Sequence, residues 1–269
     1  MLTQPTEKDD NLVQWIRNGI AVRVFGSDVD ASQSVASEIA ALIRQRAAEG
    51  ESCVLGLATG STPVRVYREL IRIHREENLS MKHVVTFNLD EYFPMQPDAA
   101  QSYVRFMNEQ LFDHVDIPRS SIHIPDGTIG RDGVDEYCQQ YEDAINVAGG
   151  IDLQLLGIGR TGHVGFNEPG SEVDSATRLV ELCDITRSDA ANDFGGLDNT
   201  PELAITMGVG TILRSRRIRL LAFGQHKSAI VARSVQGEIT DSVPATYLQG
   251  HDDVQFALDS AAASTLDPK

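Results

Sequence analysis

The chain has 269 residues, of which 41% are hydrophobic and 23% charged, and its formal net charge is −16. This composition is typical of a globular protein with a sizeable core. The negative charge argues against nucleic acid and anionic membranes as partners, because both bind basic surfaces.

We find no apolar run of the roughly 18 residues that a membrane span requires. The start of the chain, MLTQPTEKDD, has no signal-peptide pattern. Its three cysteines are widely spaced and fit neither a metal site nor a disulfide framework. We therefore expect a soluble, cytoplasmic protein.

The first half of the chain predicts strands that alternate with helices. Residues 1–18 are polar, and we expect them to be peripheral, with Trp15 and Ile16 docking them on the body of the protein. Apolar runs predict four strands, at 21–25, 53–58, 84–88 and 121–124. A helical apolar period predicts helices over 30–49, from Val64 onward, over 102–112 and over 134–147.

The second half continues the alternation. Strands are expected at 153–156, 178–182, 204–209 and 219–223, and a helix is expected from about Gly224 to Val235. Residues 188–199 are rich in Gly and Asp and are expected to form a connection. No internal repeat or linker divides the chain. The pattern predicts one α/β domain over residues 1–269, with a single doubly wound, mostly parallel sheet and helices on both faces, as in Rossmann-like folds.

Polar side chains follow several of these strands, at the edge of the sheet where open α/β folds bind ligands. The strand at 153–156 ends in a turn with three glycines, and His163 and Glu168 follow it. A carboxylate near an imidazole can fix the His tautomer and help it move protons. The alternative is a Gly-rich connection with a surface histidine.

Two further strand ends favour anion binding. Gly60, Ser61 and Thr62 form a small-residue turn into a helix, where free N–H groups and hydroxyls can bind a phosphate. Lys227 follows the strand at 219–223 and can supply the positive charge that an acidic protein needs for such a ligand. The alternatives are an ordinary helix N-cap and a solvated lysine.

Asp90 and Glu91 follow the strand at 84–88. Adjacent side chains on an extended segment point in opposite directions. One carboxylate can therefore face the site as a general base while the other is tied into the structure. No further ligands stand at metal spacing, so a metal is not expected.

At these residues the chain resembles the glucosamine-6-phosphate deaminase family, also called glucosamine-6-phosphate isomerase. The matching segments span roughly residues 53–227 and agree in order and spacing. They are LATGSTPVRVYREL, VVTFNLDEYF, SYVRFMNEQLFDHVDIP, GIGRTGHVGFNEPGS and AITMGVGTIL.

The resemblance implies a Rossmann-like fold and a conversion of glucosamine 6-phosphate to fructose 6-phosphate and ammonia that needs no metal or cofactor. Asp90 resembles the base that moves a proton between C2 and C1 of the sugar. His163, supported by Glu168, resembles the catalyst of ring opening. Ser61, Thr62 and Lys227 resemble the phosphate-binding positions. The resemblance implies a deaminase of the hydrolase class that acts in amino-sugar metabolism.

The chain departs from the family at two positions. Thr161 stands where Asp or Asn is common, so Glu168 must orient His163 alone or together with the Thr161 hydroxyl. The family's phosphate-binding Arg, in an Asn-x-Arg-Phe-Phe-like stretch, has no counterpart in 190–194, which read AANDF. Arg187 lies nearby and is the candidate to compensate. The residues of the hexosamine allosteric site are incompletely matched, so allosteric activation is not implied.

Other interpretations stay open. A related sugar-phosphate isomerase or a hydrolase like 6-phosphogluconolactonase would share the fold and a Gly-His turn. A dinucleotide fingerprint at 157–162 is disfavoured, because Pro169 and the neighbouring glycines leave no room for the pyrophosphate-binding helix. A sugar-phosphate-sensing domain without catalysis is the alternative outside enzymes. The expected partner is a small sugar phosphate, and the sequence leaves open whether the chain forms a homo-oligomer.

Overall fold

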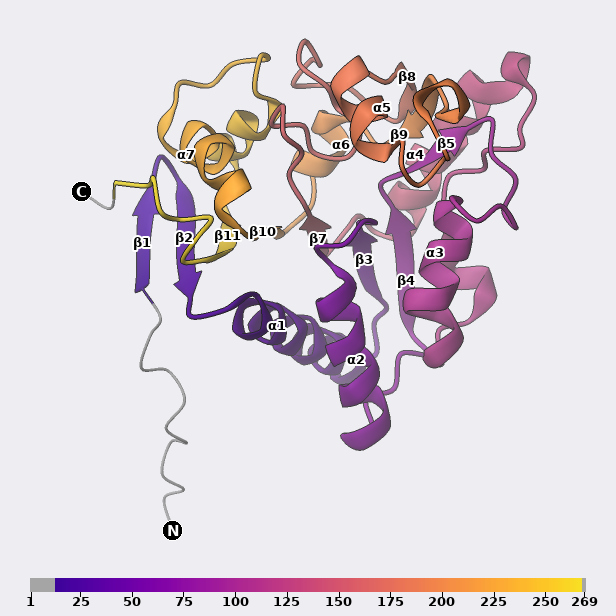
Figure 1. The fold of residues 1–269 in the computed structure, drawn as a ribbon. Helices are drawn as coiled ribbons and strands as arrows, with labels where there is room; N and C mark the ends of the chain where they lie inside the picture. Colours follow the sequence, from indigo (N-terminus) through magenta and orange to yellow (C-terminus); the bar gives the residue numbers. More distant parts are fainter. Residues whose placement is uncertain (1–12, 268–269) are drawn as a thin grey trace.

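The computed structural model describes residues 13–267, and its main sheet has eight strands (Figure 1). Neighbouring strands pair in parallel, except for the antiparallel pair of β1 and β2 at one edge. In spatial order the strands are β1 (Val13–Arg17), β2 (Ile20–Phe25), β11 (Val254–Asp259), β10 (Ile218–Ala222), β7 (Leu153–Leu156), β3 (Cys53–Leu57), β4 (Val84–Asn88) and β6 (Ile122–His123).

Helices cover both faces of this sheet, and Figure 1 shows α1 and α2 on one side with α6 and α7 on the other. The helices are α1 (Asp28–Ala48), α2 (Val64–Glu76), α3 (Tyr103–Gln110), α4 (Val134–Val147), α5 (Asp184–Ala190), α6 (Val209–Leu213) and α7 (Ser228–Gln236). The predicted doubly wound, mostly parallel α/β architecture is confirmed.

Each face of the sheet has its own buried apolar cluster. Strand residues such as Leu55 pack with Tyr67 of α2 and Met107 of α3 on one face. Phe87, which points to the opposite face, packs with helices α4 and α7. Because strands β3, β4 and β7 are buried on both sides, they read as nearly continuous apolar runs, which made them predictable.

A second sheet, which the sequence analysis did not predict, has three antiparallel strands. Its order is β5 (Asp90–Phe93), β9 (Leu203–Thr206) and β8 (Arg178–Glu181). Leu89 alone separates β4 from β5, so the chain passes directly from the large sheet into the small one. The prediction of a single sheet was therefore wrong. All four residues of β5 are buried, so the segment lacks the alternation that indicates a strand with one face in water.

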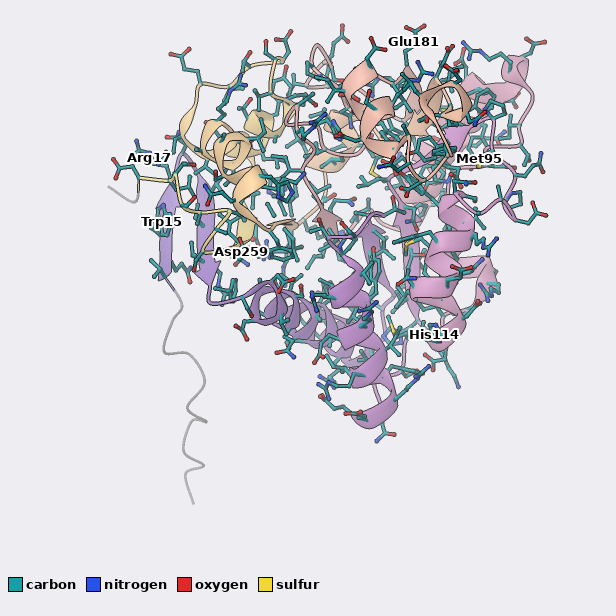
Figure 2. The ribbon with its side chains drawn as sticks, in the orientation of Figure 1. Trp15, Arg17, Met95, His114, Glu181 and Asp259 are labelled. Atoms are coloured by element: carbon teal, nitrogen blue, oxygen red, sulfur yellow. The ribbon has the colours of Figure 1, made fainter. Side chains whose placement is uncertain are left out.

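The N-terminal prediction was partly wrong. Residues 1–12 lie outside the described residues. Residues 13–17 form the edge strand β1, and Ile16 is 73% exposed, so it does not dock this segment. Trp15 packs against the core, because neighbouring side chains of a strand point to opposite faces. Figure 2 shows Trp15 and Arg17 on this edge strand.

Other elements also differ from the predictions. Strand β9 ends at Thr206 rather than Val209, because the chain there enters α6. Helix α5 begins at Asp184 and includes the first residues of the predicted connection at 188–199. Strand β11, at Val254–Asp259, was not predicted.

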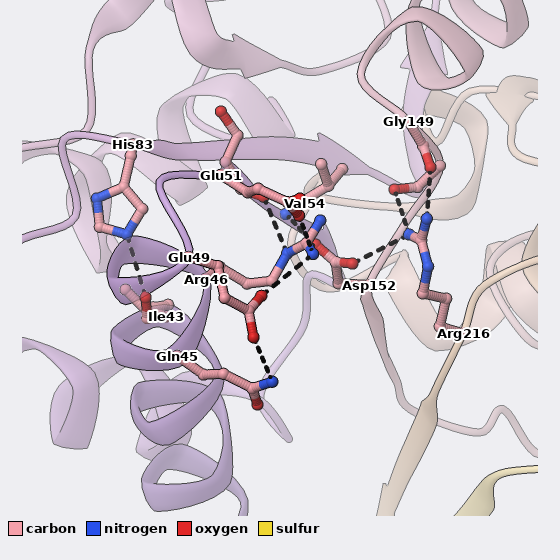
Figure 3. A network of polar contacts seen from close by, with 12 residues as sticks. Ile43, Gln45, Arg46, Glu49, Glu51, Val54, His83, Gly149, Asp152 and Arg216 are labelled. Carbon is pink, nitrogen blue, oxygen red and sulfur yellow. Dashed lines mark hydrogen bonds and ion pairs between the residues drawn. The ribbon is translucent and has the colours of Figure 1, made fainter.

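The amino ends of the central strands are held by Asp152, just before β7. Its carboxylate accepts a hydrogen bond from the backbone N–H of Val54 (2.9 Å) and pairs with Arg216 (3.0 Å) and Arg46 (3.4 Å), as Figure 3 shows. This buried network lies at the end of the strands opposite the pocket described below. No helix within residues 13–267 is long and apolar enough to cross a membrane.

Candidate active site

A pocket of about 230 Å³ lies at the carboxyl ends of β3, β4 and β7. This is the edge where parallel sheets place ligand-binding residues. Of the eight residues predicted for the site, five line this pocket: Gly60, Ser61, Thr62, Asp90 and His163. The other lining residues come from the same strand ends and from two aromatic positions: Ala58, Thr59, Leu89, Tyr103, Gly157, Ile158, Gly159, Gly165 and Phe166.

Asp90 and Glu91 have different environments although they are adjacent. Asp90 lines the pocket, and its pKa is raised to about 8 by burial and then by the charge of Glu91. The Glu91 carboxylate turns away and accepts hydrogen bonds from the Ser102 hydroxyl (2.8 Å) and the Tyr103 N–H (2.8 Å). It thereby anchors the first turn of α3, where a negative charge is favoured. Asp90 therefore faces the pocket while Glu91 is bound into the structure, and the catalytic role of Asp90 stays a prediction.

His163 and Glu168 form a hydrogen-bonded pair beside the pocket, with 3.2 Å between Nδ1 and Oε2. The Thr161 hydroxyl lies 2.9 Å from the same Nδ1 and donates to Glu168 Oε2 at 3.2 Å. Burial alone would raise the pKa of Glu168. The hydrogen bond between Glu168 and His163 and their electrostatic attraction outweigh this effect and lower the pKa of Glu168 to about 2. Glu168 is therefore charged at neutral pH, and two oxygen acceptors face Nδ1. This arrangement favours a proton on Nδ1.

Thr186 of α5 and Cys183, which precedes the helix, also contact this pair, and neither was predicted from the sequence. Thr186 Oγ1 lies 3.5 Å from His163 Nδ1 and accepts a hydrogen bond from Cys183 Sγ at 3.5 Å. Hydrogen bonds from Thr186 and Cys183 also help to lower the pKa of Glu168. A lone threonine such as Thr186 carries no sequence signal for this contact, because the contact depends on how α5 folds back over the turn.

Glycine is required at two positions of the turn after β7. A side chain at Gly159 would place its Cβ 2.0 Å from His163 Nε2, so this glycine leaves room for the imidazole. Gly162 has φ +83°, which other residues rarely adopt, and its Cβ would lie 2.5 Å from Val243.

Comparison with known proteins places the chain in a family. Residues 27–256 match the family described as glucosamine-6-phosphate isomerases/6-phosphogluconolactonase. The chain belongs to this family.

Several relatives are similar over most of their length. A glucosamine-6-phosphate deaminase of Shewanella halifaxensis is 46% identical over 87% of this chain and 89% of the relative. One from Bacillus velezensis is 43% identical over 87% of this chain and 95% of the relative. A deaminase-like protein of Bacteroides thetaiotaomicron is 45% identical over 92% of this chain, but the match spans only 37% of that longer protein.

Solved structures of the family share the architecture. A monomeric glucosamine-6-phosphate deaminase superposes with a TM-score of 0.86 at 42% identity, over 90% of this chain and 98% of the other. The 6-phosphogluconolactonase from Trypanosoma brucei superposes with a TM-score of 0.74 at 20% identity, over 91% and 98% of the two chains. The second likeness shows a common fold.

The three remaining predicted site residues, Glu168, Lys227 and Arg187, are not part of the pocket lining. Glu168 stands behind His163 and faces a neighbouring cavity of about 720 Å³. Lys227, half-buried after β10, donates from Nζ to the carbonyl of Ile158 at 2.7 Å, and Ile158 is part of the pocket wall. Burial lowers the pKa of Lys227 from its ordinary value, and the nearby charge of Asp189 opposes that effect.

Arg187 has a different environment from the one predicted. Its Nη2 donates to the backbone carbonyls of Leu197 (3.3 Å) and Thr200 (3.2 Å), and the residue is not part of the pocket lining. In this position Arg187 holds the loop after α5. Within residues 13–267 no group of three or more His, Cys, Asp or Glu side chains is arranged to hold a metal ion.

Proposed function

We propose that the chain converts glucosamine 6-phosphate and water to fructose 6-phosphate and ammonia. The observation that carries this proposal is that two proton-transfer groups meet at one pocket. The carboxyl group of Asp90 can exchange protons near neutral pH, and the imidazole of His163 is hydrogen-bonded to the charged carboxylate of Glu168. The first suits proton transfer at carbon and the second suits proton transfer at oxygen. The relatives at 41–46% identity that are named for this activity support the same substrate.

The reaction begins with ring opening at His163. With Nδ1–H directed to Glu168 and Thr161, Nε2 has a lone pair that can accept the proton of the C1 hydroxyl. The imidazolium then gives a proton to the ring oxygen as the bond from C1 to that oxygen breaks. The product is the open-chain aldehyde, and the charge of Glu168 stabilises the transient imidazolium.

Proton transfer at carbon is assigned to Asp90. Its carboxylate removes the proton from C2, which the aldehyde has made acidic, and an enolamine forms between C1 and C2. The protonated Asp90 then delivers a proton to C1, and one proton of the amine passes to the C1 oxygen, which leaves a hydroxyl at C1 and an imine at C2. Water adds to this imine, ammonia departs from the carbinolamine, and fructose 6-phosphate results. Water is consumed and a carbon–nitrogen bond is broken, so the net reaction has the character of a hydrolysis.

Substrate placement is assigned to the turn at Gly60–Thr62 and to Lys227. Gly60 adopts φ +88°, and the turn leads into α2, whose N-terminus favours an anion. Lys227 contributes a positive charge beside Ile158 of the pocket wall.

Hydrolysis of a phosphorylated lactone is the second candidate, because the fold is shared with 6-phosphogluconolactonases at 17–22% identity. Lactone hydrolysis requires no proton transfer at carbon, so it gives no role to the buried Asp90. The test is to incubate the purified protein with glucosamine 6-phosphate, with its keto-sugar and N-acetylated analogues, and with 6-phosphogluconolactone. We expect ammonia from the first alone. Lactone hydrolysis without ammonia would favour the second candidate, and binding of glucosamine 6-phosphate without turnover of any compound would indicate a sensing domain.

A further inference from the structure

The phosphate group of the proposed substrate is a dianion, and the chain around it is strongly acidic, with a net charge of −16. Lys227 supplies one positive charge at the pocket wall. Arg187, which the sequence suggested as the second cation, does not line the pocket, and its Nη2 donates to two backbone carbonyls of the loop that follows α5. We therefore looked for a second cation on the turn that forms the pocket wall beside Lys227.

Arg160 lies between two residues of the site. It follows Gly159, which lines the pocket, and precedes Thr161, which contacts His163. Its guanidinium forms a bidentate ion pair with the carboxylate of Asp189 in α5, with 3.0 Å from Nε to Oδ2 and 2.9 Å from Nη2 to Oδ1. Both side chains are about half exposed, at 56% and 46%. A pair this exposed contributes little stability and can be exchanged for another anion.

Arg160 also lies near Lys227. The Lys227 ammonium is bonded to the carbonyl of Ile158, two residues before Arg160 on the same turn. The charges of Arg160 and Asp189 both act on the pKa of Lys227, which places the three groups within electrostatic reach of one another. Together they carry one net positive charge, and without Asp189 the two cations carry two.

We propose that Arg160 is the second phosphate-binding cation of this site, and that Asp189 competes with the substrate phosphate for its guanidinium. The proposal rests on the function proposed above, because it names the residue that binds the phosphate of that substrate. A guanidinium binds phosphate with the same bidentate geometry with which it binds Asp189. Release of Asp189 leaves Arg160 and Lys227 to neutralise the dianion, and it links phosphate binding to the position of α5.

The competition has an unusual signature, since removal of the two partners has opposite effects. Arg160→Gln removes a phosphate ligand and weakens binding, by about tenfold if one charge-assisted contact is lost. Asp189→Asn removes the competitor and tightens binding severalfold. In the double variant R160Q/D189N the benefit of the Asn disappears, because no guanidinium is left to release. Arg119 and Asp113 form another exposed Arg–Asp pair, outside the pocket, and the variants R119Q and D113N serve as matched controls.

Binding is measured by calorimetry on the full chain and its variants, with 2-amino-2-deoxyglucitol 6-phosphate as probe. This reduced sugar has no carbonyl and cannot react, so the measurement does not depend on turnover. Inorganic phosphate and unphosphorylated 2-amino-2-deoxyglucitol separate phosphate recognition from sugar recognition. We expect opposite changes for R160Q and D189N with both phosphates and no change with the unphosphorylated sugar.

Three results would overturn the proposal. They are unchanged phosphate affinity in R160Q, weaker phosphate affinity in D189N, and equal effects of R160Q on the phosphorylated and unphosphorylated sugars. Failure of the proposed function would look different. If R160Q and D189N change the phosphate affinity as expected but the wild-type protein releases no ammonia from glucosamine 6-phosphate, the phosphate site is supported and the proposed reaction is not.

Discussion

The hydroxyl of Thr161 lies 2.9 Å from Nδ1 of His163. It also donates to the Glu168 carboxylate, so a neutral hydroxyl and one carboxylate share the proton of the imidazole. A threonine at this position therefore orients the ring without adding charge. The charge that stabilises an imidazolium must come from Glu168.

Because only Glu168 carries a charge, substitutions at Glu168 and at Thr161 should have unequal effects on turnover. Glu168→Gln keeps the size of the side chain but removes the charge, and turnover of glucosamine 6-phosphate should fall by about 10²–10⁴-fold, the usual contribution of acid–base assistance. Thr161→Asp should preserve activity, because it supplies another acceptor for Nδ1–H. Steady-state kinetics of both variants provide the measurement. If Glu168→Gln left turnover nearly unchanged while Thr161→Ala strongly reduced it, His163 would be held in another way.

The same assay can isolate ring opening. A 4,5-dideoxy analogue of glucosamine 6-phosphate lacks both hydroxyls that close a five- or six-membered ring, so it stays an open chain. Glu168→Gln should therefore lose much less activity on this analogue than on glucosamine 6-phosphate. Equal losses on both compounds would place Glu168 outside ring opening.

The raised pKa of Asp90 predicts that both activity and stability depend on pH. Its folded pKa of about 8 means that the carboxylate form, which accepts the C2 proton, increases as the pH rises toward 8. The acidic limb of kcat/KM should lie near that pH. Asp90→Asn cannot accept a proton and should lose exchange of the C2 hydrogen with solvent deuterium, measured by NMR. Exchange at the wild-type rate would move the base to another residue.

The stability effect has the opposite sign from that of a typical salt-bridged aspartate. Between pH 4 and 8, folded Asp90 keeps a proton that the unfolded chain has released, because the folded pKa is raised from 3.8 to about 8. The free energy of unfolding therefore falls as the pH rises through this window. Asp90→Asn removes that loss, so the variant should gain stability over the wild type as the pH rises from 5 to 8.5 in urea titrations. An identical difference at both pH values would contradict the raised pKa.

Glu91 should behave as a structural residue. Its carboxylate accepts hydrogen bonds from Ser102 and from backbone N–H groups at the start of α3. Glu91→Gln should lower the free energy of unfolding by about 1–3 kcal/mol, because buried donors lose a charged acceptor. Glu109→Gln, which changes an exposed glutamate at the end of the same helix, should stay within about 0.5 kcal/mol of wild type. Urea denaturation compares the two, and equal effects would show that Glu91 does not anchor the helix.

Gly159 should be required for the position of the imidazole. The Cβ of Gly159→Ala would lie 2.0 Å from His163 Nε2, so the ring must move. A displacement of this size costs about 10²-fold in rate when it affects a catalytic group. Gly250→Ala adds a methyl group with no atom within 4 Å and serves as a control. Unchanged kcat in Gly159→Ala would mean that the ring position is not critical.

The sequence predicted the parts of the fold that depend on local patterns. The buried runs of β3, β4 and β7 and the helical periods of α1 and α4 are visible in the chain alone. The separation of Asp90 from Glu91 follows from the geometry of an extended segment. These features need no knowledge of distant contacts.

The features that were missed depend on contacts between distant segments. Strand β5 pairs with β9, more than 100 residues later, and its fully buried sequence carries no strand period. Thr186 reaches His163 only because α5 folds over the turn after β7. Arg187 and Arg160 both lie near the expected site in sequence, but only side-chain positions reveal that the first is bound to carbonyls and the second to Asp189.

The most direct test of the account compares the wild-type protein with Asp90→Asn on glucosamine 6-phosphate, with ammonia and fructose 6-phosphate quantified in the same samples over time. We expect the wild type to form the two products in equal amounts and Asp90→Asn to form neither at a comparable rate. Absence of both products with the wild type, or their formation by Asp90→Asn at the wild-type rate, would contradict it.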